Sequence, residues 1–232
     1  MTTVVLVHGA FHDGWCWELV RSALDERGVP NQALDLPFTG LEGDAEAVGK
    51  LLDAVDGPVV LVGHSYGGMV ISRAASGRDD VDHLVYLCAV QVGEDVDLAT
   101  AMTTSDELMS AIVAGDDGAM HVDTALAPAV FYHDCDDELT ATAVSHLRGM
   151  GFGVVQDNDE PPPPAAWKQI ESTYVVCTDD QTIAPESQRK MATNAQHVVE
   201  WDTSHSPMLS RPELVADLLA DLAAQTTKAS AS

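Results

Sequence analysis

Five short apolar runs, each bounded by turn residues, constrain the fold of this chain most strongly. They are rich in valine and mostly lack alternation between apolar and polar residues, as expected for strands buried on both faces of a parallel sheet. The runs are Val4–Val7, Val59–Val62, Leu84–Ala89, Tyr174–Cys177 and His197–Trp201. Because stretches with helical periodicity separate them, the sequence predicts an α/β fold with a mostly parallel central sheet flanked by helices.

Two of the expected helices can be located by their apolar stripes. The i, i+3, i+4, i+7 spacing that marks one helical face is followed by Val48, Leu51, Leu52 and Val55. A second stripe consists of Leu214, Val215, Leu218, Leu219 and Leu222. The helix that carries it is expected to begin with a capping box in which Ser210 and Glu213 take part.

The alternation of strands and helices stops between residues 91 and 165. This stretch is rich in Met, Asp and Thr, is expected to be helical over Asp106–Ala114 and Asp136–Leu147, and closes with Pro161–Pro164. We expect residues 1–90 and 166–225 to form the core, and residues 91–165 to be a small helical insertion in the same domain. That insertion is called the cap below. Residues 226–232 are small and polar, as in a flexible tail.

Composition narrows the class of protein. The 232 residues carry 37 acidic and 11 basic side chains, a formal net charge of −26, and 46% of them are apolar. So high an apolar fraction is typical of a folded domain, and so acidic a surface argues against binding nucleic acid or anionic lipid. No apolar run reaches the ~18 residues of a membrane span. Four widely spaced cysteines indicate reduced thiols and a cytoplasmic location.

The most informative motif is Gly63-His64-Ser65-Tyr66-Gly67, which follows the apolar run Val59–Val62 and precedes a helix-compatible segment. Gly-x-Ser-x-Gly between a strand and a helix is typical of a sharp turn that exposes a serine hydroxyl at the carboxyl end of the sheet. The helix N-terminus that follows favours developing negative charge. We therefore predict that Ser65 is a nucleophile.

A nucleophilic serine needs a base, and the base needs an orienting acid. In enzymes with this turn the chain order is serine, acid, histidine, and each partner follows a later strand. His205 follows the last predicted strand and precedes the final helix, so we predict it as the base. Asp179 and Asp180 both follow the run Tyr174–Cys177, and of the two we favour Asp180.

Backbone amides complete the expected site. The N–H group of the residue after the nucleophile, Tyr66, and one from the loop after the first strand are expected to form an oxyanion hole. In that loop the Gly9-Ala10 junction allows close approach of the backbone, which favours the Ala10 N–H.

Ligand-type residues elsewhere do not form a recognisable metal or nucleotide motif. The segment His133-Asp134-Cys135-Asp136 matches no zinc or calcium spacing and is better explained as the acidic start of a helix. The sequence has no Gly-x-Gly-x-x-Gly and no P-loop. We expect neither a metal nor a cofactor.

These motifs resemble one branch of the α/β-hydrolase family, the methylesterases and hydroxynitrile lyases. The resemblance is carried by His8–Trp17, Gly63–Met69, Val176–Asp180 and His205–Pro212, with Phe131–Cys135 in the cap. It implies a cofactor-free serine hydrolase with a small helical lid over a mostly apolar pocket. In that family the catalytic acid precedes an Ile and a Gln, here Ile183 and Gln188, which supports Asp180.

Three positions distinguish the two activities of this branch. The lyases resembled here have a threonine where this chain has Gly9, a lysine where it has Ser206, and a glutamate where it has His64. The resemblance therefore favours ester hydrolysis. The first part of the cap departs from the plant members, so their substrates cannot be transferred to this chain.

The sequence thus predicts a carboxylesterase that acts on small, neutral, largely apolar esters through an acyl-enzyme. Phe11, Phe131 and Met208 are expected to line the pocket. Two alternatives remain: a hydroxynitrile lyase or other cofactor-free lyase or oxygenase, and a ligand receptor on a hydrolase scaffold. The expected partner is a small-molecule ester, with no nucleic acid and no membrane, and the protein is either a monomer or a homodimer.

Overall fold

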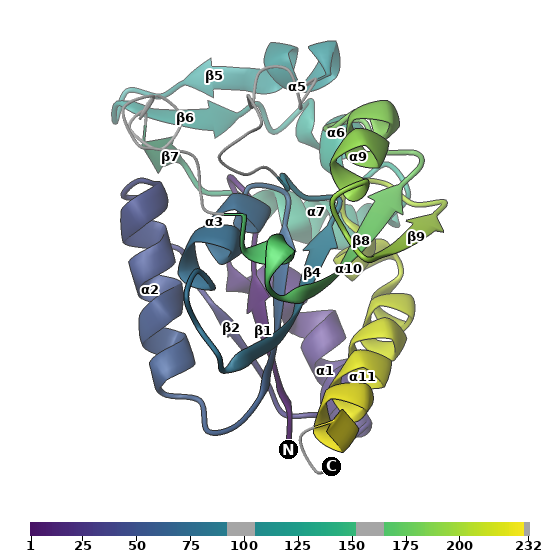
Figure 1. Cartoon of the computed structure of the whole chain (residues 1–232). Coiled ribbons are helices and arrows are strands. Elements are labelled where there is room, and N and C mark those ends of the chain that lie inside the picture. Colours follow the sequence, from purple (N-terminus) through teal and green to yellow (C-terminus); the bar gives the residue numbers. More distant parts are fainter. Residues whose placement is uncertain (92–104, 152–164, 230–232) are drawn as a thin grey trace.

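The computed structural model describes residues 1–91, 105–151 and 165–229, and Figure 1 shows their arrangement. Within these residues, six parallel strands form a central sheet in the order β2-β1-β3-β4-β8-β9. The bounds are β1 Thr3–Val7, β2 Asn31–Leu34, β3 Val59–His64, β4 Val81–Leu87, β8 Glu171–Cys177 and β9 His197–Trp201. All five predicted strands are present, and so is the predicted parallel α/β architecture.

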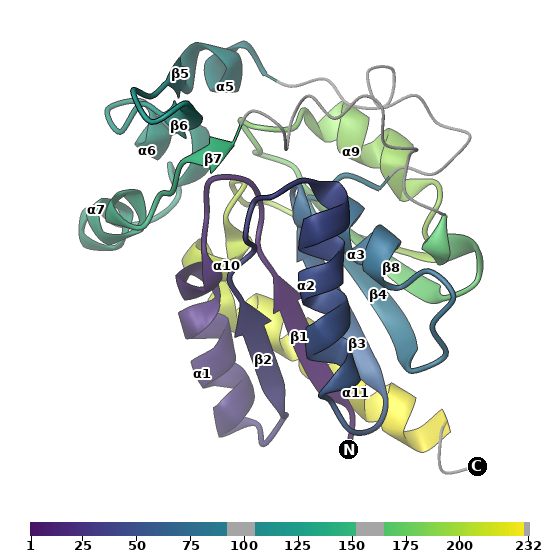
Figure 2. The same cartoon turned by 90° about the vertical axis from the view of Figure 1, so that its left-hand side faces the viewer.

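Helices cover both faces of the sheet. The longer ones are α1 Glu18–Glu26, α2 Leu41–Asp53, α3 Gly67–Ala74, α9 Pro185–Ala192 and α11 Pro212–Ala229; the short ones are η1 Gly14–Trp17, η2 Ala166–Lys168 and α10 Pro207–Ser210. Helices α1 and α11 lie together on one face, and α2 and α3 lie together on the other (Figures 1 and 2). The second predicted stripe lies wholly on α11, and the first lies on α2 except for Val55, which follows the end of that helix.

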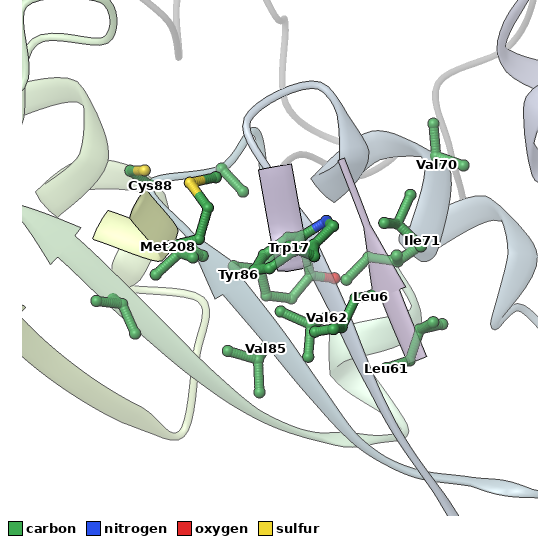
Figure 3. Close-up of a cluster of buried hydrophobic side chains, with 14 of the residues drawn as sticks. Leu6, Trp17, Leu61, Val62, Val70, Ile71, Val85, Tyr86, Cys88 and Met208 are labelled. Atoms are coloured by element: carbon green, nitrogen blue, oxygen red, sulfur yellow. The ribbon is translucent and has the colours of Figure 1, made fainter. Parts of the chain in front are cut away.

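The core explains why the valine-rich runs can be recognised as strands in the sequence. Every residue of β1 and β3 is buried, because both strands are central and have helices above and below them. Figure 3 shows part of the apolar cluster, with Leu6, Val62 and Val85 from the strands and Trp17 from η1. Apolar side chains are therefore favoured on both faces of such a strand, so the alternation disappears.

Strand β2 was not predicted from the sequence. Its residues, Asn31–Leu34, are only half-buried or exposed, because β2 lies at the edge of the sheet and pairs with β1 alone. An edge strand needs no continuous apolar run, so it carries a weak sequence signal.

The expected start of the last helix was wrong. Ser210 ends α10 instead of capping α11. Glu213 pairs with Arg27, the residue that follows α1, at 2.7 Å between Oε2 and Nη2. The expected tail also differs, because α11 continues to Ala229; the last three residues of the tail lie outside the described range.

The described part of the cap is not wholly helical, which corrects the expectation. It contains α5 Asp106–Ala111, α6 Ala127–Phe131 and α7 Asp137–Ser145, and also an antiparallel sheet of β5 Ile112–Ala114, β6 Ala119–Val122 and β7 Met150–Gly151. The expected helix from Asp106 therefore ends at Ala111. A tight turn with Gly118 at φ +77° and a hydrogen bond from Gly115 N to Ala119 O at 2.8 Å join β5 to β6. The proline run lies outside the described residues.

Figures 1 and 2 show the cap elements above one end of the central sheet, beyond the carboxyl ends of its strands. The two chain ends lie near the opposite end of the sheet. In the parts of the chain described, no helix is both long and apolar enough to cross a membrane.

For four of the buried histidines, His8, His12, His64 and His83, burial keeps the imidazole neutral. Desolvation lowers the pKa of His8 to about 4, of His12 to about 3 and of His83 to about 4, and places the pKa of His64 well below its usual range. In the unfolded chain each imidazole has an ordinary pKa of about 6.5. The unfolded state therefore binds more protons below that pH, and the folded state is destabilised by acid.

We expect the free energy of unfolding to fall as the pH drops below about 6.5, by up to ~1.4 kcal/mol per pH unit for each such histidine. The variant His83→Gln keeps a polar group near Thr173, to which His83 is hydrogen-bonded at 2.8 Å, and removes one titrating group. Urea unfolding at several pH values between 7 and 5 should give a slope against pH that is shallower by about one proton. Equal slopes would contradict the prediction.

Candidate active site

The turn between β3 and α3 holds Ser65 in a strained backbone conformation. Ser65 has φ +52°, in the left-handed region that costs a non-glycine residue about 1–2 kcal/mol. A Cβ on Gly63 would lie 2.5 Å from the Gly67 carbonyl oxygen, and one on Gly67 would lie 2.8 Å from the His8 carbonyl oxygen. Only glycines permit this close backbone approach, which leaves the half-buried Ser65 at the carboxyl end of the sheet.

His205 and Asp180 meet in the interior beside this turn. His205 lies between β9 and α10, Asp180 follows β8, and both side chains are almost fully buried. The distance from His205 Nδ1 to Asp180 Oδ2 is 2.6 Å. The Asp180 carboxylate also accepts hydrogen bonds from the Thr182 N–H at 2.6 Å and the Ile183 N–H at 3.0 Å. It is a preorganised acceptor for the imidazole Nδ1–H.

Gln188 links this carboxylate to the sheet. Its Nε2 donates to Asp180 Oδ2 at 2.7 Å, and its Oε1 accepts from the Cys177 N–H at 2.9 Å. The two aspartates that the sequence offered as the acid have different positions. Asp179 is exposed and pairs with His133 of the cap at 3.0 Å, so Asp180 and not Asp179 contacts His205.

The residue before the serine connects the turn to the histidine. His64 Nε2 donates to the His205 carbonyl oxygen at 2.8 Å, and the two ring centroids lie 4.7 Å apart. Within the described residues no hydrogen bond joins Ser65 Oγ to His205. Such bonds are often long before substrate binds and shorten in the reactive complex.

The two predicted oxyanion donors flank Ser65. Gly9 lies against the serine, because a Cβ on it would be 2.8 Å from Ser65 Cβ, and this contact places the Gly9–Ala10 peptide beside the serine. Tyr66 immediately precedes α3, and its hydroxyl donates to Asp44 Oδ2 of α2 at 2.8 Å. Burial raises the pKa of Asp44, although this hydrogen bond opposes the rise.

The three predicted pocket residues differ in their surroundings. The Phe131 ring lies 6.0 Å from the His205 ring, and Phe11 is buried in the loop that also carries Ala10. Met208 is fully buried in the apolar cluster with Trp17 and Cys88 (Figure 3), so it packs in the core. The assignment of these residues to a substrate pocket stays a prediction.

Sequence reasoning missed how the end of α6 is attached to the two loops that carry Asp180 and His205. The Thr182 hydroxyl donates to the Val130 carbonyl at 3.1 Å, and the Ser204 hydroxyl donates to the Phe131 carbonyl at 3.2 Å. Asp134 accepts from the Ser204 N–H at 3.0 Å. The cap segment thus holds the loops that carry Asp180 and His205. The only sequence signal was the acidic cluster at residues 133–136, in which Asp136 caps α7 as expected.

Among the described residues, one group of potential metal ligands lies close together. The ligand atoms of His64, Cys88 and His205 are within 4.8 Å of one another. His64 Nε2 and the Cys88 thiol both donate to the His205 carbonyl, at 2.8 and 3.5 Å, and His205 Nδ1 is bonded to Asp180. This group is therefore engaged in the hydrogen-bond network around His205.

Residues 4–218 match the alpha/beta hydrolase family. The chain belongs to this family. It is 30% identical to a probable hydrolase, R7, from a Phoma species over 95% of this chain and 97% of that protein. It is 27% identical to methylesterase 2 of Arabidopsis thaliana over 94% and 95% of the two chains. The structure resembles a pyrethroid hydrolase from Sphingobium faniae with a TM-score of 0.81 and 27% identity, over 96% and 97% of the chains.

The family and these relatives assign the chain as an ester hydrolase on the α/β-hydrolase fold. Its resemblance to methylesterases, stated above from four sequence segments, is confirmed. The β3–α3 turn has the strand-turn-helix arrangement of this fold, and Asp180 and His205 follow the later strands β8 and β9 in that order.

The contact between Gly9 and Ser65 leads to a prediction. In Gly9→Ala the added Cβ would lie 2.8 Å from Ser65 Cβ and 2.9 Å from His64 Nδ1, so the loop or the serine must shift. We expect at least ~10-fold slower labelling of Ser65 by a fluorophosphonate, since a displacement of about 1 Å can cost ~100-fold.

Gly49→Ala is the matched control, because a Cβ at this position in α2 meets nothing within 4 Å. It should label at the wild-type rate and melt at a higher temperature, as alanine is favoured over glycine in a helix by about 1 kcal/mol. Labelling of Gly9→Ala at the rate of this control would overturn the interpretation.

Proposed function

We propose that this protein is a carboxylesterase in which Ser65, His205 and Asp180 form the catalytic triad. Ser65 Oγ attacks the ester carbonyl carbon as its proton passes to His205 Nε2, and the carbonyl oxygen becomes an oxyanion. The Ala10 and Tyr66 N–H groups stabilise this oxyanion. Collapse of the intermediate breaks the bond to the alcohol oxygen, which takes the proton from Nε2 and leaves acylated Ser65.

Deacylation follows the same steps with water in place of the serine. Water attacks the acyl carbon while His205 Nε2 accepts its proton, and that proton then returns to Ser65 Oγ as the carboxylic acid leaves. Asp180 holds Nδ1–H, so that Nε2 is the free acceptor, and stabilises the imidazolium that forms in each step. Residues 91–165 would act as a cap over this site and as part of the same domain.

One observation carries the proposal: a buried 2.6 Å contact between Asp180 and His205, next to a serine held at φ +52°. A carboxylate buried with two backbone N–H donors and a glutamine keeps a fixed position in a medium of low dielectric constant. A strained residue at the end of a strand is typical of a functional position.

The surroundings of Gly9 and Ser206 favour hydrolysis of esters over cleavage of cyanohydrins. A lyase of this branch would need a threonine at the first position, and a Cβ there would already contact Ser65 at 2.8 Å. Ser206 is uncharged, so this position offers no cationic group to a cyanide ion.

The direct test is incubation with a fluorophosphonate, followed by peptide mapping and a panel of p-nitrophenyl and methyl esters. We expect one adduct, on Ser65, and turnover of the esters. Ser65→Ala should abolish both, and Asp180→Asn should lower kcat by about 10³–10⁴-fold with the fold retained. An adduct elsewhere, no adduct, or cleavage of mandelonitrile without cleavage of esters would refute the proposal.

The acidic surface predicts a preference for uncharged esters. With a formal net charge of −26, the protein should repel anionic substrates at low salt. We expect kcat/KM to be higher for a neutral ester than for its carboxylate-bearing analogue at about 0.01 M salt, where the Debye length is roughly 30 Å. The difference should shrink at about 1 M salt. Faster turnover of the anionic ester at low salt would contradict the prediction.

A further inference from the structure

The loop that carries the Ala10 N–H has a strained backbone. Phe11, the next residue, has φ +63°, a left-handed conformation that is unfavourable for a residue with a bulky side chain. Such a conformation persists only where the surroundings hold it. The contacts around this loop therefore matter for the position of the Ala10 N–H.

A buried imidazole makes the first of these contacts. His12 Nδ1 lies 2.7 Å from the Ala10 carbonyl oxygen, and His12 is 4% exposed. A carbonyl oxygen can only accept a hydrogen bond, so Nδ1 carries the proton. Burial lowers the pKa of His12 to about 3, so the ring is neutral and Nε2 must be an acceptor.

The cap supplies the matching donor. The Tyr132 hydroxyl lies 2.9 Å from His12 Nε2, and Tyr132 is 1% exposed. Burial raises the pKa of Tyr132, which keeps it a phenol that donates its proton. The hydrogen bonds run in one direction, from Tyr132 O–H to His12, and from His12 N–H to the Ala10 carbonyl.

The His12 imidazole also packs against other aromatic rings. The ring centroids of Phe131 and His64 lie 5.2 and 5.8 Å from that of His12, with planes at 74° and 87°. A second tie joins the same loop to the cap, since the Arg148 N–H donates to the Phe11 carbonyl at 2.7 Å. The cap therefore holds the carbonyls on both sides of the strained Phe11. It holds the Phe11 carbonyl directly through Arg148 and the Ala10 carbonyl through His12.

We propose that His12 and Tyr132 are positioning residues. Through the Ala10 carbonyl they hold this residue in place, so that its N–H meets the developing oxyanion. The inference rests on the proposed function above. Neither side chain is assigned contact with the substrate. They act through Ala10. Their effect is to stabilise the transition state, because oxyanion donors are effective only when fixed at hydrogen-bond distance.

Tyr132→Phe is the sharpest test, because it removes one oxygen atom and keeps the ring. We expect kcat to fall by roughly 10-fold and KM to stay within about twofold, since displacement of a donor affects the transition state. The Ki of a trifluoromethyl ketone, which forms an oxyanion on the serine, should rise by the same factor as kcat/KM falls.

Tyr86→Phe is the matched control. Tyr86 is also fully buried and its hydroxyl also makes one side-chain hydrogen bond, to Ser72 at 2.8 Å. The Tyr86→Phe variant should lose about as much thermal stability as Tyr132→Phe, but its kcat and its Ki for the ketone should equal those of the wild type.

A second pair of variants tests His12 itself. His12→Asn keeps a donor that can reach the Ala10 carbonyl, whereas His12→Leu has none. We expect the asparagine variant to retain several-fold more kcat than the leucine variant when the two are compared at equal folded fraction.

The outcomes separate the two proposals. If the wild type hydrolyses esters and labels at Ser65 but Tyr132→Phe behaves like Tyr86→Phe, or changes KM alone, the positioning role is overturned and the esterase stands. If the wild type neither turns over esters nor labels at Ser65, the proposed function is overturned and this inference with it. A fall in kcat matched by weaker ketone binding, absent in Tyr86→Phe, supports the positioning role.

Discussion

Close backbone approach around Ser65 is the constraint on which the rest of the site depends. The loop after β1, the turn from β3 to α3 and the end of β4 meet there, so that a Cβ on Gly67 or Gly68 would lie within 2.8 Å of backbone from another segment. Hydrogen bonds from the Gly68 and Val90 N–H groups to the Ser65 carbonyl, both 3.0 Å, join these segments. These contacts offset the strain at Ser65.

Burial organises the electrostatics that follow from this packing. Asp180 is buried with several donors, and His12 and His64 are buried as neutral rings. His12 donates to the Ala10 carbonyl within its own loop, and His64 donates to the His205 carbonyl of another loop. In a medium of low dielectric constant such bonds are strong and unpaired groups are costly, so each ring has a defined tautomer and orientation. The cap joins the network through Tyr132 and Asp134, which makes it part of the site's architecture.

Strands buried on both faces carried the clearest signal in the sequence, and helices with one solvated face could be located from their apolar stripes. The valine-rich runs of β1 and β3 are continuous because both faces of these strands are buried. The edge strand β2 and the small sheet β5-β6-β7 have mixed side chains and little burial, so their identity depends on neighbours that are distant in sequence. The capping box also failed because of a contact distant in sequence: Glu213 pairs with Arg27, the residue that follows α1.

By itself the sequence determined the parallel α/β fold and named Ser65, His205 and two adjacent aspartates, because these features depend on local spacing after a strand. Tertiary structure decided which aspartate contacts His205, since the orientation of each carboxylate is set by Gln188, Thr182 and the cap residue His133. It also decided the bond between Tyr132 and His12, which are 120 positions apart. Contacts of that kind arise when the folded chain brings distant loops together, and no periodicity in the sequence encodes them.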